Sequence, residues 1–244
     1  LSNAGRDDHH SASSPKIYRI QSNRDPKMTR ERKLRRLLCE IGKKVHASGY
    51  VAANDGNLSV RLNSDMILIT PTNVSKGAMT PKMIAKISPS GISRDKNQPT
   101  SEYRLHLAIY KQWNWVNAII HTHPPYATAW AITGQGLSAP ILPEAVLTIG
   151  QIPLVRYESP ATQELADLVA AAIKEHDVVL MQNHGLVAVG RDLIDAFYKT
   201  ERAEHIFRIM TIAKQLGEIR HLNPAEIEEL YRLYNVPERY RINY

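Results

Sequence analysis

The chain has 244 residues, 43% of them hydrophobic and 23% charged, which suits one globular domain with a sizeable core. Its apolar runs are all shorter than the roughly 18 residues of a membrane span, which excludes a helical membrane protein. The formal net charge is +7, but the excess lies wholly within residues 1–44 and leaves the rest of the chain neutral, which argues against a nucleic-acid-binding body.

The N-terminal segment differs in character from the rest. Residues 1–27 are polar and lack a periodic apolar pattern, so we expect a disordered tail with a tag remnant, followed by a single domain over residues 28–244. Its basic side chains are expected to be solvated. The single cysteine, Cys39, cannot form an internal disulfide, and no secretory signal is visible, so we expect a cytoplasmic protein.

Periodic apolar residues predict the elements of the first half. A helix runs from Thr29 to a stop at Gly49. An Asn-Asp-Gly turn then leads into strands over residues 58–62 and 66–70, which form a hairpin, and a third strand covers residues 85–88.

The second half alternates helices with strands. A helix over residues 101–113, with Thr100 or Ser101 as its N-cap, precedes a strand over residues 117–123. The remaining predicted elements follow in chain order: a helix over 126–132, a strand around Val155, a helix over 162–174, strands over 177–182 and 186–189, a long helix over 192–216 and a helical tail from Asn223. Hairpins mixed with helices favour an α/β fold with a central, mostly antiparallel sheet flanked by helices.

Two histidines lie at the end of the strand over residues 117–123. Because side chains alternate along a strand, His121 and His123 leave on the same face, within reach of one ion. A catalytic zinc site needs three protein ligands and one open position. The best third candidate is His184, which ends another apolar run; the alternative is two surface histidines and one turn histidine.

A metal held by three neutral imidazoles can polarise a carbonyl and stabilise an enediolate, provided that a base lies beside it. Glu102 is the leading candidate because it stands at a helix start next to two hydroxyl residues, although such a glutamate is often a capping partner. Asp177 and Glu144 also lie near the histidine strands and remain open as alternatives.

Three short polar segments predict an anion site. They are Gly56-Asn57 at a turn, Thr72-Asn73 in a loop and Thr100-Ser101 at a helix start. Backbone amides at a helix start favour phosphate, and short hydroxyl side chains add donors, although such residues are common in turns. Lys76 either adds charge to this site or lies on the surface.

Together these stretches resemble class II aldolase/adducin-type proteins, most closely the fuculose-1-phosphate-aldolase-like branch. The matching stretches run in family order across about residues 30–215: Gly56-Asn57-Leu58-Ser59, Ile69-Thr70-Pro71-Thr72, Thr100-Ser101-Glu102, His121-Thr122-His123 and Asn183-His184-Gly185.

The resemblance implies a three-layer α/β/α fold, a small-molecule sugar phosphate as substrate, and a ring-shaped homotetramer with active sites between subunits. It implies Zn²⁺, or a similar ion such as Mn²⁺ or Co²⁺, on His121, His123 and His184, and Glu102 as catalytic acid/base. It also implies phosphate binding by the residues at the three polar segments, which are Asn57, Thr72, Asn73, Thr100 and Ser101.

The chain departs from the family pattern at two places. Asn73 stands where the family usually has glycine, yet asparagine can also adopt a left-handed turn. Glu144 stands close to where the fuculose-phosphate enzymes carry a tyrosine that handles the aldehyde. A second tyrosine comes from a neighbouring subunit's tail in that family, and its candidates here are Tyr231, Tyr234 and Tyr240.

The expected function is a metal-dependent aldolase that cleaves or forms a ketose 1-phosphate through a dihydroxyacetone-phosphate enediolate. Sister reactions use much the same metal and phosphate sites: 4-epimerisation, methylthioribulose-1-phosphate dehydration and sugar-acid phosphate decarboxylation. The epimerase branch has aspartate at the position of Glu102, which favours the lyase side here. An adducin-like interaction module lacks the metal triad, so the three histidines favour an enzyme.

Overall fold

The computed structural model describes residues 28–139 and 141–242, so the predicted tail over residues 1–27 lies outside the described residues. Its strands form one sheet in the order β3-β2-β1-β4-β7-β6-β5, in which every neighbouring pair is antiparallel except β5 and β6. The bounds are β1 (Asn57–Arg61), β2 (Ile67–Ile69), β3 (Ala85–Ile87), β4 (Ala118–Thr122), β5 (Leu154–Val155), β6 (Val178–Met181) and β7 (Gly185–Gly190). The prediction of a mostly antiparallel central sheet is confirmed.

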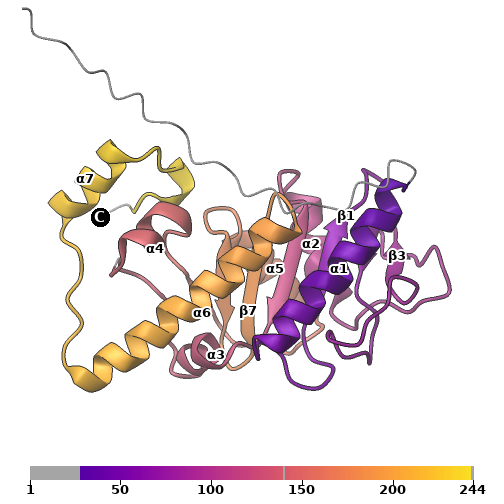
Figure 1. Ribbon diagram of the computed structural model, residues 1–244, viewed down its shortest axis with the longest axis horizontal. Helices are drawn as coiled ribbons and strands as arrows, with labels where there is room; N and C mark the ends of the chain where they lie inside the picture. The colour runs from indigo at the N-terminus through magenta and orange to yellow at the C-terminus, as the bar shows by residue number, and fades with distance from the viewer. Residues whose placement is uncertain (1–27, 140, 243–244) are drawn as a thin grey trace, which may run out of the picture.

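Helices cover both faces of this sheet, which gives three α/β/α layers (Figure 1). They are α1 (Arg30–Ala47), α2 (Tyr103–Gln112), α3 (Pro125–Ile132), α4 (Pro143–Thr148), α5 (Gln163–Ala172), α6 (Leu193–Leu216) and α7 (Pro224–Leu233), followed by a 3₁₀ turn, η1 (Glu238–Tyr240).

Successive side chains of β4 pack alternately against the helices on the two faces of the sheet. Ile119 packs with residues of α2 and α5, whereas Ala118 and Ile120 pack with residues of α1 and the start of α6. All three side chains are fully buried. By the same alternation, His121 is directed to the α2 side of the sheet.

The first helix and hairpin follow the sequence signals closely. The Thr29 side chain accepts a hydrogen bond from the Arg32 amide at 3.4 Å and caps α1. Gly49 has a φ of +72°, a conformation that glycine adopts without strain, and it ends the helical segment. β1 pairs with β2 in the predicted hairpin.

One local prediction was wrong, and one helix was missed. The N-cap position of α2 is occupied by Glu102, not by Thr100 or Ser101. The helix α4 was not predicted at all, because six residues are too few to show helical periodicity. This helix packs against the C-terminal segment through Val146, which joins a small apolar cluster with Ile227, Tyr231, Val236 and Tyr240.

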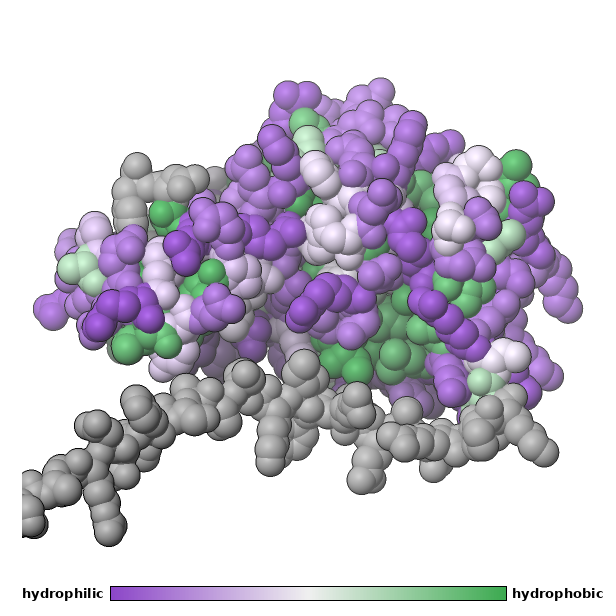
Figure 2. Space-filling view, turned by 90° about the horizontal axis from the view of Figure 1, so that it is seen from above, coloured by the Kyte–Doolittle hydropathy of each residue, from purple (hydrophilic) through white to green (hydrophobic). Residues whose placement is uncertain are grey.

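The surface is largely polar. Figure 2 shows a mostly hydrophilic face from above, with its largest hydrophobic area below the centre of the view and smaller ones elsewhere. Among the described residues, every helix is too short or too polar to span a bilayer.

Candidate metal and anion site

Three imidazoles meet at the end of the sheet where α3 begins. His121 lies in β4, His123 follows the last residue of that strand, and His184 lies in the tight turn between β6 and β7. The strand register brings the turn to β4, since Thr122 pairs with Leu186. One ligand atom from each histidine lies within 4.8 Å of the other two, so the sequence-predicted metal triad is brought together.

The geometry of this triad fits a small divalent ion. Tetrahedral ligands at 2.0–2.1 Å from zinc lie about 3.3 Å apart, and the Nε2 atoms of His121 and His123 are 3.2 Å apart. The Nδ1–H of His121 donates to the Leu186 carbonyl at 3.0 Å, which leaves its Nε2 lone pair free. Among the described residues, the buried Nδ1 of His184 has no hydrogen-bond partner, whereas its Nε2 faces the Oε1 of Glu102 at 3.4 Å.

The carboxylate of Glu102 lies directly beside these imidazoles. Its Oε2 is 3.2 Å from the Nε2 of His121 and accepts a hydrogen bond from the Asn57 amide at 2.8 Å. Its Oε1 is 3.4 Å from the Nε2 of His184. The side chain makes no capping hydrogen bond, so the capping interpretation is wrong.

The charges in this cluster shift one another's pKa values. Burial alone would raise the pKa of Glu102, but His121, His184 and the Asn57 amide hold it well below its usual range. Burial and the nearby His121 lower the pKa of His123 and of His184 to about 4 each. Burial also disfavours charge on His121, yet the neighbouring carboxylate raises its pKa. Two imidazoles are therefore neutral at pH 7, the form that binds metals.

A small polar cavity of about 150 Å³ adjoins the histidines. Glu102 and His123 belong to its wall. The sequence-predicted anion residues also line it: Asn57, Thr72, Asn73, Thr100 and Ser101. Asn73 has a φ of +56°, so it adopts the left-handed conformation expected of a residue that replaces glycine.

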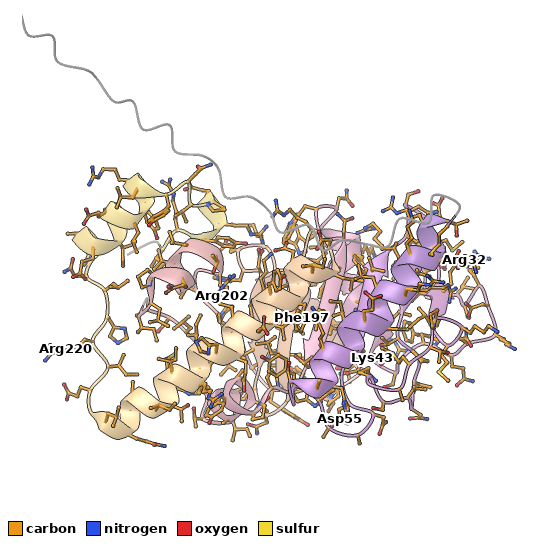
Figure 3. The ribbon with its side chains drawn as sticks, viewed as in Figure 1. Arg32, Lys43, Asp55, Phe197, Arg202 and Arg220 are labelled. Atoms are coloured by element: carbon orange, nitrogen blue, oxygen red, sulfur yellow. The ribbon has the colours of Figure 1, made fainter. Side chains whose placement is uncertain are left out.

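Two residues at this cavity were missed or misjudged from the sequence. The Asp55 carboxylate lies 3.7 Å from the Nδ1 of His123, and Figure 3 shows it on the loop that follows α1. Lys76 is 1% exposed, so the surface interpretation is wrong. Its Nζ donates to the carbonyls of Asn54 at 2.9 Å and Val74 at 2.6 Å. Asp55 could have been suspected from its turn, whereas nothing in the sequence distinguishes Lys76 from a solvated lysine.

The other candidate bases lie in different surroundings. Asp177 is buried in a cluster with Lys199 and Arg239, at 2.8 and 2.7 Å. Glu144 is exposed in the first turn of α4. Glu102 is thus the carboxylate that the described structure brings into contact with His121 and His184.

The three candidate tail tyrosines also differ. Tyr231 is buried and its hydroxyl accepts a hydrogen bond from the amide of Ile242 at 2.9 Å. Tyr240 is buried and donates to Asp177. Tyr234 is 54% exposed, so among these three it is the one with a largely exposed side chain.

Known proteins resemble the chain over most of its length. The family described as Class II Aldolase and Adducin N-terminal domain matches residues 36–211. An L-fuculose phosphate aldolase from Methanococcus maripaludis is 37% identical over 169 residues, which cover 69% of this chain and 91% of that relative. A 3-oxo-tetronate 4-phosphate decarboxylase from Escherichia coli is 31% identical over 207 residues, which cover 82% and 96%.

Solved structures lead to the same family. The structure of YgbL from Escherichia coli superposes with a TM-score of 0.77 at 29% identity and covers 83% of this chain and 99% of that protein. The family match spans the three histidines, the polar loops that line the cavity and Glu102. The chain therefore belongs to the class II aldolase and adducin family.

Proposed function

We propose that the chain is a metal-dependent lyase that acts as an aldolase on a ketose 1-phosphate, through the enediolate of dihydroxyacetone phosphate. The observation that supports this most is one small polar cavity, where side chains suited to an anion lie beside a buried carboxylate and three clustered imidazoles. A phosphorylated ketone needs such a combination, because the anion site holds the reacting carbon against the base.

His121, His123 and His184 would hold one divalent ion, either Zn²⁺ or a similar ion such as Mn²⁺ or Co²⁺. When bound, the ion would act as a Lewis acid toward the substrate's ketone oxygen. The protein's contribution is to keep His123 and His184 neutral and to fix the His121 ring through the Leu186 carbonyl.

Glu102 serves as the general base and acid in this proposal. In the synthetic direction its carboxylate takes the proton from the carbon that becomes nucleophilic, and in cleavage it returns that proton. The Asn57 amide holds the carboxylate in place at 2.8 Å. The phosphate would be bound by the polar residues that line the cavity: Asn57, Thr72, Asn73, Thr100 and Ser101.

A second candidate is the decarboxylation of a 3-oxo sugar-acid phosphate. The 3-oxo-tetronate 4-phosphate decarboxylase aligns over 82% of the chain and the phosphate aldolase over 69%. No tyrosine stands near Glu144 in the sequence, close to where the resemblance places the tyrosine that handles the aldehyde in fuculose-phosphate enzymes. Both reactions leave an electron pair on the carbon beside the ketone and differ in the departing group, an aldehyde or carbon dioxide, so one set of residues serves either.

We also propose the homotetramer, with sites at the subunit interfaces, that the family resemblance implies. The exposed Tyr234 is the tail tyrosine best suited to enter a neighbouring subunit's site, because Tyr231 and Tyr240 are committed to contacts within their own chain. We expect a cytoplasmic enzyme without a nucleic-acid partner.

The test is a product analysis with the full chain as purified. Dihydroxyacetone phosphate is incubated with a panel of aldehydes, and a 3-oxo sugar-acid phosphate is incubated separately. A condensation product supports the aldolase, and released carbon dioxide supports the decarboxylase. Loss of water or an inverted centre in a matched ketose phosphate would instead indicate a sister reaction.

Metal analysis separates the enzyme from an interaction module. Protein purified without chelator should contain about one divalent ion per chain, since three imidazole ligands suffice for a catalytic site. Protein that contains none and takes up none on titration would favour the non-catalytic class.

A further inference from the structure

A row of buried polar side chains runs from Glu102 into the interior between β1 and α2. Asn57 and Ser59 lie two residues apart on β1, and His106 and Tyr110 lie four residues apart on α2. All four are at most 3% exposed. Two residues along a strand span about 6.6 Å and four residues along a helix about 6 Å. Asn57 and Ser59 are therefore spaced to face His106 and Tyr110.

Each link in this row is a short hydrogen bond. The hydroxyl oxygens of Tyr110 and Ser59 are 2.8 Å apart, and the Ser59 oxygen is 2.7 Å from the Nδ1 of His106. The Nε2 of His106 is 2.5 Å from the Asn57 side-chain oxygen. The Asn57 amide nitrogen donates to the Glu102 carboxylate at 2.8 Å.

The direction of every link follows from the carboxylate. An ionised carboxylate only accepts, so Asn57 must present its NH₂ group to Glu102 and its oxygen to His106. The facing Nε2 of His106 must then carry the hydrogen.

The remaining links follow from the charge of the ring. Burial, with a further contribution from the nearby His121, lowers the pKa of His106 to about 3 and keeps the imidazole neutral. Its Nδ1 therefore accepts from the Ser59 hydroxyl, and Ser59 accepts from Tyr110.

We propose that His106 is a positioning residue that locks the Asn57 side chain with its NH₂ group toward Glu102 and the anion cavity. If this amide were rotated by 180°, its oxygen would face the carboxylate, and the Nε2–H of His106 would lose its acceptor. The second amide hydrogen of Asn57, which lines the cavity, remains available to a phosphate oxygen. This inference rests on the proposed function, because it assigns His106 a role at that same site.

The test compares His106→Gln with His106→Leu. A glutamine amide can donate to Asn57 through its nitrogen and accept from Ser59 through its oxygen, so it preserves the direction of the row. Leucine fills similar space without either bond. His205→Leu, on the exposed surface of α6, is the matched control for the substitution itself.

Three measurements are made on the full chain as purified. They are the binding of inorganic phosphate by calorimetry, kcat and KM for whichever lyase reaction the product analysis finds, and the nitrogen NMR signals of His106. Wild type should show a neutral ring protonated at Nε2. His106→Leu should weaken phosphate binding about tenfold and lower kcat about 10–100-fold, the usual cost of removing an outer hydrogen-bond partner. His106→Gln should recover both to within about threefold, and His205→Leu should match wild type.

The outcomes separate this inference from the proposed function. A ring protonated at Nδ1, or a folded His106→Leu variant that binds phosphate and turns over like wild type, overturns the role of His106 even if the enzyme is an aldolase. If His106→Leu does not fold, two other results test the role of His106. A ring protonated at Nε2 together with near-wild-type phosphate binding in His106→Gln supports it, and failure of either result overturns it. Phosphate binding that responds as expected in a protein without lyase activity would sustain the role of His106 and end the lyase proposal.

Discussion

Glu102 is the residue on which the proposed proton transfer depends most directly. Its carboxylate contacts two imidazoles and receives the Asn57 amide. Glu102→Gln keeps the shape but removes the base, so metal content and fold should stay, while exchange of dihydroxyacetone-phosphate protons into solvent should fall by about 10²–10⁴-fold.

Deuterium incorporation followed by NMR measures that exchange, and elemental analysis measures the metal. Undiminished exchange in the metal-loaded variant would remove Glu102 from the role of base.

Lys76 should give the proposed anion site a pH dependence. Burial lowers its pKa to about 8, although the carboxylate of Asp55 acts in the opposite direction. The ammonium charge is thus present below pH 8 and is lost as the pH rises through that value. Inhibition by inorganic phosphate should weaken by about tenfold between pH 7 and pH 9, because a charge-assisted interaction is lost.

Lys76→Met should bind phosphate weakly at both pH values, and so flatten the profile. Lys82→Met, at an exposed position, is the control and should retain the wild-type profile. If phosphate inhibition of Lys76→Met still weakens steeply between pH 7 and pH 9, a group other than Lys76 is responsible for the pH dependence.

Prediction of single residues succeeded where a spacing rule applied. It failed where the role of a side chain depends on its burial in the folded chain. The alternation of His121 and His123 along a strand required only their two-residue spacing. His106 belongs to the same helical pattern as its apolar neighbours, so the sequence does not show that its ring bonds two polar side chains. Lys76 looks like any loop lysine until the packing of two loops around it is known.

At the scale of elements, the turn between β6 and β7 positions His184 through Gly185. A Cβ atom added there would lie 2.5 Å from the Thr122 carbonyl oxygen and 2.6 Å from the His123 ring. Gly185→Ala should therefore push β7 from β4, cost about 1–3 kcal/mol of stability and weaken metal binding by tenfold or more.

Metal titration and thermal melting check this prediction. Gly134→Ala is the control for metal affinity, because an added Cβ meets nothing within 4 Å there. Its positive φ imposes a backbone strain that Gly185 does not have, so thermal melting alone does not compare the two variants. Equal metal affinity in the two variants would show that β7 tolerates the added atom.

Element prediction was accurate where periodic patterns were long. The α1, α5 and α6 helices begin within one or two residues of the expected positions, and each carries a side-chain N-cap: Thr29, Thr162 and Asp192. The α2 cap was misassigned because Thr100 and Ser101 are the favoured N-cap types, whereas Glu102 holds that position without a capping hydrogen bond. The Glu102 side chain instead contacts two histidines distant in sequence, which the local sequence does not show.

At the scale of the whole molecule, a buried ion cluster ties the C-terminal segment to the sheet. Asp177, 1% exposed, pairs with Lys199 of α6 and with Arg239, and it accepts a hydrogen bond from Tyr240. Asp177→Asn removes the anion shared by the buried Lys199 and the partly buried Arg239. Lys199 keeps its pair with Asp195 at 3.1 Å. The variant should lose about 3 kcal/mol of stability, which corresponds to a Tm loss on the order of 10 °C.

Hydrogen exchange should then show faster exchange in α7 and η1 before the central strands open. Glu229→Gln, which removes an exposed pair with Arg232, should change the stability by less than about 1 kcal/mol. Unchanged protection of the C-terminal segment in Asp177→Asn would place its anchorage in the apolar cluster with α4 instead.

The separation of the three histidines along the chain has a thermodynamic consequence. His121 and His184 meet only after β4 and β7 have paired, so an unfolded chain offers no preformed chelate to the ion. The ion is then linked to the folding equilibrium itself: at a free concentration 1,000 times its Kd it would add about 4 kcal/mol to the free energy of unfolding. Dialysis against a chelator should lower the melting temperature as metal is removed. The melting temperature therefore reports how much of the protein has metal bound.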